Sequence, residues 1–226
     1  SSSDQRQVIQ ASEILAKIKR GEPVEYDYKV IEGDLDLSGL YLPTEQVGRT
    51  KQELRQGLSE ELKVIASEIT IINSEIRGKV NFSNAHFQKT VSFWGDKSFK
   101  RVEFTNDVDL RGAQFDGNVN FAGVIFNYAN FMWTEFTGET DFGGTRFKGD
   151  VYFWKSVFSR GANFLQAKFG RKARFGGAQF NGTANFMFAE FTEYAGFGEV
   201  QFSGKANFQQ ATFGEKVWFL GAVFRE

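Results

Sequence analysis

The chain has 226 residues, with 27 Lys and Arg residues against 28 Asp and Glu residues. This balance gives neither the basic surface typical of nucleic-acid-binding proteins nor a strongly acidic one. Cysteine is absent, which excludes disulfides and thiolate metal sites, and the one histidine, His86, leaves almost no material for a histidine-based metal site or triad. Phenylalanine is the unusual feature, since 27 residues are Phe and only 2 are Pro.

The sequence shows neither a signal peptide nor an apolar run close to the roughly 18 residues that span a bilayer. We therefore expect no membrane segment in this chain and, by default, a cytoplasmic location. The first residues are Ser1-Ser2-Ser3 rather than a methionine, which we interpret as processing, truncation or a tag.

The N-terminal part divides into three predicted segments. Residues 1–22 are expected to form a capping helix, because apolar residues recur at roughly helical spacing until Gly21 and Pro23; they are Val8, Ile9, Ile14, Leu15 and Ile18. Residues 23–42 are predicted to form a first leucine-containing coil with Leu35, Leu37, Leu40 and Leu42. Residues 43–64 are charged and favour a helix, so we expect a helical insertion that leaves the coil.

Residues 65–226 carry a regular repeat. Ile65, Ile71 and Ile76 begin it, and phenylalanines then recur every five or six residues from Phe82 to Phe224. From Phe82 this ladder has 27 positions, of which 26 are Phe and one is Leu110; Phe188 alone lies outside it. The residue two positions before each ladder residue is nearly always small or β-branched, with Lys97 as the charged exception.

Steps of five and six residues give no apolar stripe on a helix of 3.6 residues per turn. From Phe136 onward the steps alternate, so two double units make a period of about 22 residues. A chain that turns a corner at each step would close a four-sided coil, bonded to the next coil at about 4.8 Å and stabilised by stacking. The predicted inward ladder includes Phe142, Phe153, Phe164, Phe175, Phe186, Phe197, Phe208 and Phe219. An extra Gly in the six-residue steps, such as Gly117 or Gly204, is expected to adopt positive φ at a corner.

Three segments match one unit directly: Ala162-Asn163-Phe164-Leu165-Gln166, Ala184-Asn185-Phe186-Met187-Phe188 and Ala206-Asn207-Phe208-Gln209-Gln210. They resemble the pentapeptide-repeat proteins, whose unit is Ala-(Asp/Asn)-(Leu/Phe)-x-x, over about residues 80–224. The resemblance implies an all-β solenoid, a right-handed quadrilateral β-helix. Every second unit here has an extra residue, so we expect about 22 residues per coil rather than about 20, with distorted corners.

The two ends of the column are expected to differ. The helix at residues 1–22 would cover unpaired strand edges at one end. No comparable cap follows Phe224, so either the natural protein continues or the open C-terminal coil associates end to end with another copy.

Stacking of coils of this length predicts two outer features. Asn120, Asp141, Asn163, Asn185 and Asn207 should form an external Asn/Asp ladder whose amides hold the coils in register. On the opposite side, one face should carry Met132, Trp133, Tyr152, Trp154 and Trp218, with Gly196 and Gly198 between them. Clustered aromatic residues can mark a binding patch, although the Pro43–Lys63 insertion or a neighbouring molecule could equally cover them.

The sequence contains no Walker loop, Rossmann fingerprint or zinc motif. The pairs Gly143-Gly144 and Gly176-Gly177 are interpreted as corner glycines rather than phosphate loops, and His86 is expected on the outer surface. No catalytic, cofactor-binding or metal-binding residue is predicted, no cofactor is expected, and the chain is not expected to be an enzyme.

These observations leave two candidate functions for the chain. The first is a structural or protein-interaction module, a rigid repeat scaffold that binds an unknown protein partner. The alternative, implied by the resemblance, is a regulator that mimics DNA and binds a topoisomerase or another nucleic-acid-binding protein. Mimicry needs a negative face, and outward Lys and Arg residues argue against it. Nucleic acid itself is not an expected partner.

Overall fold

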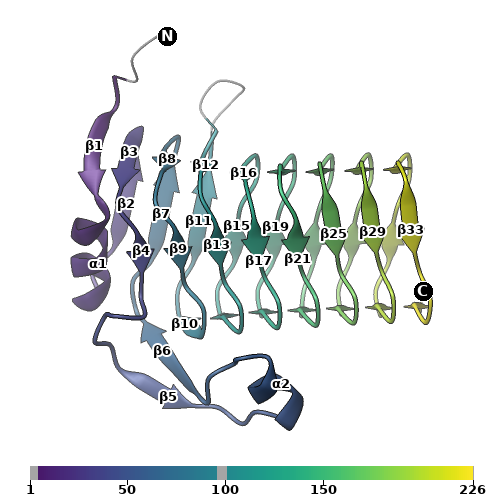
Figure 1. Ribbon diagram of the computed structural model, residues 1–226, viewed down its shortest axis with the longest axis horizontal. Helices are drawn as coiled ribbons and strands as arrows, with labels where there is room; N and C mark the ends of the chain where they lie inside the picture. Colours follow the sequence, from purple (N-terminus) through teal and green to yellow (C-terminus); the bar gives the residue numbers. More distant parts are fainter. Residues whose placement is uncertain (1–4, 96–100, 226) are drawn as a thin grey trace.

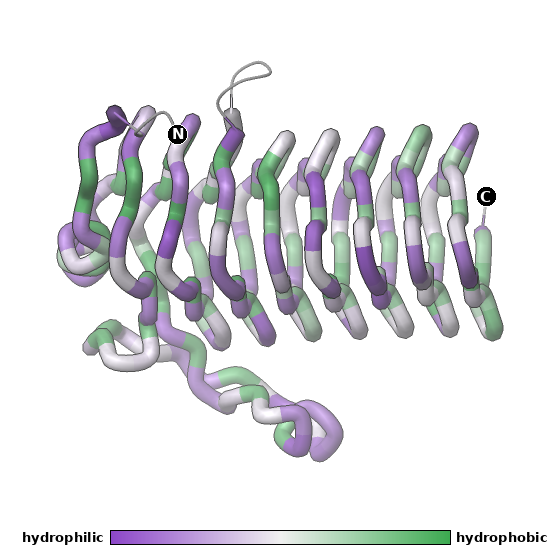
Figure 2. Tube along the Cα trace, turned by 45° about the horizontal axis from the view of Figure 1, so that its top comes forward, coloured by the Kyte–Doolittle hydropathy of each residue, from purple (hydrophilic) through white to green (hydrophobic). Residues whose placement is uncertain are grey.

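The computed structural model describes residues 5–95 and 101–225, which form an elongated column with an arm beside its N-terminal half (Figure 1). The chain turns a corner after every two to four extended residues, and each circuit passes once through each of four parallel sheets. Hydrophobic and hydrophilic residues alternate along every circuit (Figure 2). This alternation points one set of side chains inward and the other outward.

Two of the sheets come first in each circuit, and we call them sheet B and sheet A. Sheet B follows the order β2 (Val24–Asp27), β7 (Ile69–Ile72), β11 (Val91–Trp94), β15 (Val119–Asn120), β19 (Thr140–Asp141), β23 (Ala162–Asn163), β27 (Ala184–Asn185) and β31 (Ala206–Asn207). Sheet A follows the order β1 (Gln7–Gln10), β3 (Lys29–Glu32), β8 (Glu75–Ile76), β12 (Glu103–Phe104), β16 (Ile125–Phe126), β20 (Arg146–Phe147), β24 (Lys168–Phe169), β28 (Glu190–Phe191) and β32 (Thr212–Phe213).

Sheets C and D complete the circuit. Sheet C follows the order β4 (Leu35–Asp36), β9 (Val80–Asn81), β13 (Val108–Asp109), β17 (Ala129–Asn130), β21 (Val151–Tyr152), β25 (Lys172–Arg174), β29 (Tyr194–Gly196) and β33 (Lys216–Trp218). Sheet D follows the order β5 (Thr44–Gln46), β6 (Glu61–Ile65), β10 (Ala85–Phe87), β14 (Gln114–Phe115), β18 (Glu135–Phe136), β22 (Val157–Phe158), β26 (Gln179–Phe180), β30 (Gln201–Phe202) and β34 (Val223–Phe224).

The strand register confirms the predicted quadrilateral β-helix. Ala162 pairs with Ala184 and Ala184 with Ala206, so these coils have the predicted length of about 22 residues. One coil is shorter by a residue, since Phe115 pairs with Phe136. Another is longer, because sheet A continues from Ile76 directly to Phe104. Phe99 and Lys97, which belong to the predicted repeat, lie outside the described residues.

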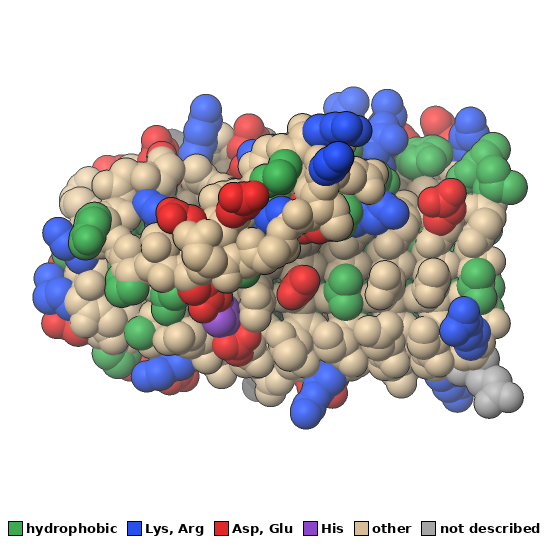
Figure 3. Space-filling model, turned by 90° about the horizontal axis from the view of Figure 1, so that it is seen from below, with side chains coloured by type: hydrophobic (Ala, Val, Ile, Leu, Met, Phe, Trp, Pro, Cys, Tyr) green, Lys and Arg blue, Asp and Glu red, His purple; other side chains and the backbone are tan. Residues whose placement is uncertain are grey.

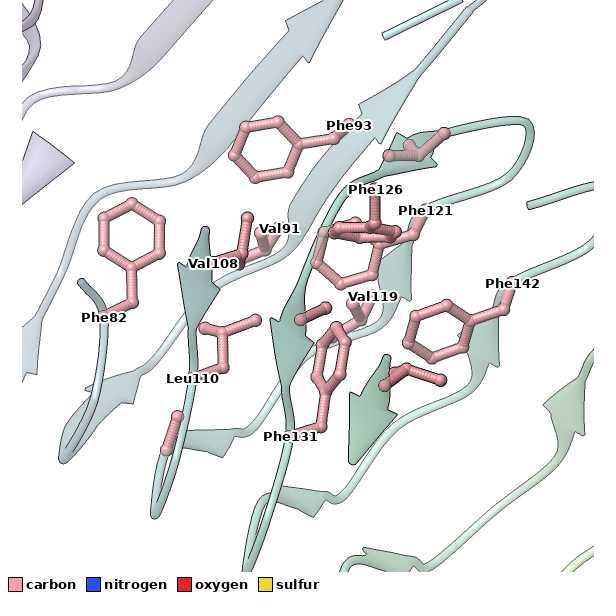
Figure 4. Packing of buried hydrophobic residues seen from close by; sticks show 14 of the residues in the cluster. Phe82, Val91, Phe93, Val108, Leu110, Val119, Phe121, Phe126, Phe131 and Phe142 are labelled. Carbon is pink, nitrogen blue, oxygen red and sulfur yellow. The ribbon is translucent and has the colours of Figure 1, made fainter. Parts of the chain in front are cut away.

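The predicted phenylalanine ladder is the core of the column (Figure 4). In each sheet, rings of successive coils stack nearly parallel, with centroids 4.6 Å apart for Phe169 and Phe191 and 5.7 Å apart for Phe93 and Phe121. The coil spacing of about 4.8 Å sets this distance. Rings from sheets B and C meet edge to face, as Phe153 and Phe164 do at 5.5 Å and 90°, a favoured aromatic geometry.

Small residues fill the space between the ring stacks. Ala162, Ala167 and Ala173 are buried two positions before a ladder residue. Thr134 and Thr145 occupy two such sites, and their hydroxyls donate to the backbone carbonyls of Leu110 and Phe121, both at 2.9 Å. At these two sites the stacked backbone supplies the acceptor that a buried hydroxyl requires, whereas the buried Thr140 hydroxyl has no hydrogen-bond partner among the described residues.

Glycines in the six-residue steps have another role than the one expected from the sequence. Gly117 and Gly204 do not adopt positive φ. Positive φ occurs instead in the five-residue steps, for example at Gln166 with 57° and at Phe188 with 58°. A Cβ on Gly204 would lie 2.4 Å from the Gly182 carbonyl oxygen of the preceding coil. The extra glycine is thus needed because two backbones approach closely, and the expectation of positive φ there was wrong.

The N-terminal segment covers the end of the column with a strand as well as a helix. Helix α1 spans Ala11–Lys19, and Ile14 and Ile18 are buried against the core. Val8 and Ile9, which the helical spacing included, instead lie on β1, which pairs with the free edge of β3. β-branched residues suit a strand, and the edge of sheet A offers unpaired backbone groups there.

The segment 43–64, expected to be a helical insertion, is mainly a β-strand pair. Strand β5 folds back and pairs antiparallel with β6, whose outer edge has no preceding coil in sheet D to pair with. Between them, helix α2 spans only Lys51–Arg55, where Thr50 and Glu53 form a capping box. We call residues 43–62 the arm.

Replacing Phe164 with Ala should lower the free energy of unfolding by about 3–5 kcal/mol, because it leaves a cavity between the rings of Phe142 and Phe186. Urea denaturation measures the loss. The exposed Gln166 of the same coil, replaced by Ala, should change stability by no more than about 0.5 kcal/mol. A loss below about 1 kcal/mol for Phe164→Ala would contradict the assigned core.

Gly182→Ala should cost about 1–3 kcal/mol, because the new Cβ would lie 2.6 Å from the Arg160 carbonyl carbon. Gly39 is the matched control, since a Cβ there meets no atom within 4 Å. Gly39→Ala should leave stability unchanged or raise it by about 0.4–1 kcal/mol. Equal thermal midpoints for the two variants would show that the coils are not in close backbone contact at Gly182.

Candidate interaction surfaces

Sheet C carries aromatic and basic side chains on its outer surface. One outward row consists of the paired residues Asn130, Tyr152, Arg174, Gly196 and Trp218. Tyr152 contacts the ring of Tyr128 at 5.9 Å between centroids, and the Arg174 guanidinium lies 5.6 Å from the Tyr152 ring. Trp218 lies on β33, separated from β21 by β25 and β29.

The remaining predicted aromatic residues lie at the corner between sheets C and D. Trp133 and Trp154 contact each other edge to face, with centroids 5.5 Å apart. Met132 and Trp154 occupy the same position in successive coils, since the Trp133 amide donates to the Trp154 carbonyl. We call Met132, Trp133, Tyr152, Trp154 and Trp218 the sheet C aromatic face. The structure brings Trp133 and Trp154 into contact, places Met132 one coil before Trp154, and leaves Trp218 apart.

Two glycines lie directly beside the tryptophan side chains of this face. A Cβ on Gly176 would lie 3.0 Å from Trp154 Cδ1, and a Cβ on Gly198 would lie 3.3 Å from Trp218 Cδ1. Gly176 and Gly198 are neighbours in successive coils. Each indole therefore takes up space that a side chain at the neighbouring glycine would need, and stays in contact with the column.

Two members of this surface were missing from the predicted face. Tyr128 and Tyr194 precede the outward row by two positions, and Arg174 lies over the Tyr194 ring at 5.4 Å as well as over Tyr152. Burial raises the pKa of the Tyr128 phenol, and the nearby Tyr152 phenol and the carboxylates of Asp109 and Asp107 raise it further. Tyr128 therefore stays neutral. Arg174 follows Tyr152 by one whole coil, and this spacing was the sequence signal that could have added Arg174 to the predicted face.

The Asn/Asp ladder lies on the outer surface of sheet B, where Asn120, Asp141, Asn163, Asn185 and Asn207 pair in successive coils. Asn163 Nδ2 donates to Asp141 Oδ1 at 3.1 Å, and Asn185 Nδ2 donates to Asn163 Oδ1 at 3.3 Å. Asn207 Nδ2 instead lies 4.0 Å from the Met187 sulfur.

The ladder residues also have a local role that the spacing of the repeat did not predict. Each Oδ1 accepts a hydrogen bond from the backbone N–H two residues later, for example from Gly143 to Asp141 at 2.7 Å and from Leu165 to Asn163 at 3.1 Å. This Asx turn sets the corner after each strand. Sheet C uses the same turn at Asp36, Asn81, Asp109 and Asn130. From β21 onward, the sheet C row abandons it for Tyr152, Arg174, Gly196 and Trp218.

His86 faces outward, but the arm covers it, so the expectation of a surface residue was wrong. Only 8% of its area is exposed. Its Nδ1 lies 2.5 Å from Glu45 Oε1 of β5, and its Nε2 lies 2.6 Å from Asp116 Oδ2 after β14 (Figure 3). Because carboxylates accept hydrogen bonds and both ring nitrogens face one, the imidazole joins the arm to the column as a bridge.

Further contacts lie at the base of the arm and along it. At the base, the ammonium of Lys63, the residue that follows the arm on β6, donates to the carbonyl oxygens of Leu37, Ser38 and Leu40, which precede the arm, at 2.6–2.9 Å. Leu58 packs over Gly112, where a Cβ would lie 2.6 Å from Leu58 Cδ2. Arg49 and Trp133 line opposite parts of a 480 Å³ groove between the arm and the column. Among the aromatic face residues, Trp133 is the one that lines this groove with the arm.

Comparison with known proteins identifies the class. The family model for pentapeptide repeats (9 copies) matches residues 99–146, 142–186 and 189–226. These matches cover more than half of the chain, so the chain belongs to the pentapeptide-repeat family. No curated protein matches the sequence.

The described parts of the chain offer neither a membrane-spanning helix nor a cluster of metal ligands. Neither α1 nor α2, the helices within residues 5–95 and 101–225, is long and apolar enough to cross a membrane. The same residues contain no group of three or more His, Cys, Asp or Glu placed to hold a metal ion.

His86→Ala should loosen the arm, because Glu45 and Asp116 lose their shared donor. Trypsin cleavage at the exposed Lys51 and Arg55 should accelerate roughly tenfold, the factor for about 1.4 kcal/mol of lost local stability. Gln209→Ala, at an exposed position after β31 that does not line the groove beside the arm, serves as the control. Cleavage at the control rate would show that His86 does not hold the arm.

Proposed function

We propose that the chain is a rigid, non-enzymatic scaffold that binds a partner protein through the sheet C aromatic face. The observation that carries the proposal is the change in the sheet C row. Asx residues stabilise the corner from Asp36 to Asn130, and aromatic and basic residues replace them from Tyr152 onward. Stability of the column does not require this exchange, since sheet B keeps the Asx row through Asn207.

The composition of the face supports a protein partner. Tryptophan, tyrosine and arginine are the residues that contribute most binding energy at protein interfaces. Here Tyr152, Arg174 and Tyr194 lie on strands, with Arg174 between the two tyrosine rings. Trp154 lies in the corner after β21, with the Lys155 ammonium 5.6 Å from its ring. Side chains held in this way lose little conformational entropy on binding, which favours affinity.

A scaffold role also fits the interior of the molecule. Stacked rings fill the space enclosed by the four sheets, so the outer faces are what the column presents to other molecules. The lone imidazole is engaged by Glu45 and Asp116 in fastening the arm. For DNA mimicry, the support is weak, because the outward row of sheet B has one carboxylate, Asp141, among asparagines, and sheet C carries Arg174.

The test is selection of peptide ligands from a random phage library on the intact chain. Selected peptides should lose at least about tenfold in affinity for Trp154→Ala, as expected for removal of a tryptophan anchor. Tyr41→Ala removes an aromatic ring that is 88% exposed and follows β4, which β9, β13 and β17 separate from β21; this variant should bind them unchanged. Circular dichroism verifies that both variants keep the fold. Peptides that bind Trp154→Ala as tightly as the parent chain would contradict the proposed surface.

A further inference from the structure

Positive charge is concentrated in one part of the column, although the whole chain is nearly neutral. Residues 146–174 contain eight of the 27 Lys and Arg residues but only one of the 28 Asp and Glu residues, Asp150. Three of these cations, Arg146, Lys148 and Lys168, line a groove of 1110 Å³ on the outer surface of sheet A. This face carries neither the aromatic row of sheet C nor the Asx ladder of sheet B.

The two central cations are direct neighbours. Arg146 pairs in register with Lys168, and both side chains are exposed. Adjacent strands lie about 4.8 Å apart, so the like charges repel and lower the stability of the sheet. The next residue in the row, Glu190, is a register neighbour of Lys168 but not of Arg146. Lys148 has a carboxylate partner, Glu103 Oε1, at 3.6 Å. An anionic ligand would relieve the repulsion between Arg146 and Lys168.

An exposed phenylalanine borders the same groove. Phe188 is the one phenylalanine outside the repeat, its side chain is 42% exposed, and it lines the groove with the three cations. Its φ of 58° is unfavourable for a bulky residue, and glycine occupies the equivalent corner at Gly144 with φ 64°. The fold would therefore accept glycine more readily, so Phe188 contributes little to the stability of the corner.

We propose that this groove binds an extended acidic segment of a partner protein, in which an apolar residue follows the carboxylates. The carboxylates would pair with Arg146 and Lys168, and the apolar residue would contact Phe188. From the coil of Arg146 to that of Phe188 is two coil spacings, about 10 Å. An extended chain covers that distance in about three residues. This second surface is independent of the sheet C aromatic face.

The order of charges along the outward row of sheet A favours a polypeptide ligand over a nucleic acid. A nucleic-acid backbone carries a phosphate at every nucleotide and binds best to a continuous basic track. Here the cations of the row extend over two coils, and Glu190 follows immediately. Arg101 also lines the groove, but the coil of Ile125 separates it from Arg146. A peptide can match this pattern, because its carboxylates can end where Phe188 and Glu190 begin.

Fluorescence anisotropy with a labelled peptide of about ten residues, long enough to pass all the coils that line the groove, tests the proposal. The probe carries three successive glutamates and a leucine three positions later. It should bind at low salt, and its affinity should fall as salt rises. Replacing its glutamates with glutamine should abolish binding. Failure of the acidic probe to bind at low salt would overturn the proposal.

Variants of the chain locate the site. Arg146→Glu combined with Lys168→Glu should weaken binding at least about tenfold. Arg160→Glu with Lys172→Glu makes the same change in net charge outside the groove and should leave the affinity within about twofold. Phe188→Gly should weaken binding about fivefold while its thermal midpoint stays equal or rises.

Two results would contradict the assignment. Equal weakening by both charge-reversal pairs would mean that the peptide senses net charge rather than this groove. Tighter binding of an oligothymidylate of about ten nucleotides than of the peptide, with no effect of Phe188→Gly, would assign the groove to a phosphate backbone.

Discussion

The close stacking of phenylalanine rings along the column axis is the interaction on which the rest of the structure depends. Backbone pairing spaces the coils, and that spacing brings ring centroids such as those of Phe164 and Phe186 to 4.8 Å with nearly parallel planes. Each coil buries its inner face only against its neighbours. The regular coil length, with glycine wherever two backbones nearly touch, keeps every ring above the one before it.

Because the stacked core and the close backbone contacts hold the coils together, many outer positions can vary without changing the fold. Sheet B uses its outward row for Asx turns, whereas sheet C carries Tyr152, Arg174 and Trp218 and sheet A carries Arg146 and Lys168. The resulting faces differ in chemistry but have the same geometry. Such a column presents rigid rows of side chains at a fixed spacing, which is the property that a binding scaffold requires.

Much of this architecture could be predicted from the spacing of the phenylalanines. The four-sided coil, its length and the buried ladder follow from steps of five and six residues, and the structure confirms them. Local pattern could not show what depends on the free edges of the sheets: Val8 and Ile9 pair with β3, and β5 pairs with β6. The burial of His86 was missed for the same reason, since it follows from where the arm folds back.

The candidate surfaces were predictable only as far as the register was known. Spacing by whole coils places Tyr152 and Trp218 in one row, but side-chain direction decides that Trp133 contacts Trp154 and that Arg174 lies between two tyrosines. The basic groove on sheet A was missed because net charge over the whole chain conceals its concentration in residues 146–174.

A double-mutant cycle on Phe164 and Phe186, each replaced by Leu, tests the central claim most directly. Their rings stack at 4.8 Å, and the account predicts a coupling energy of about 0.5–1.5 kcal/mol in urea denaturation. Phe164 and Phe208 lie two coils apart, with the ring of Phe186 between them, and should show additive effects. Additive effects for Phe164 and Phe186 as well would contradict the claim that coil-to-coil ring stacking holds the column together.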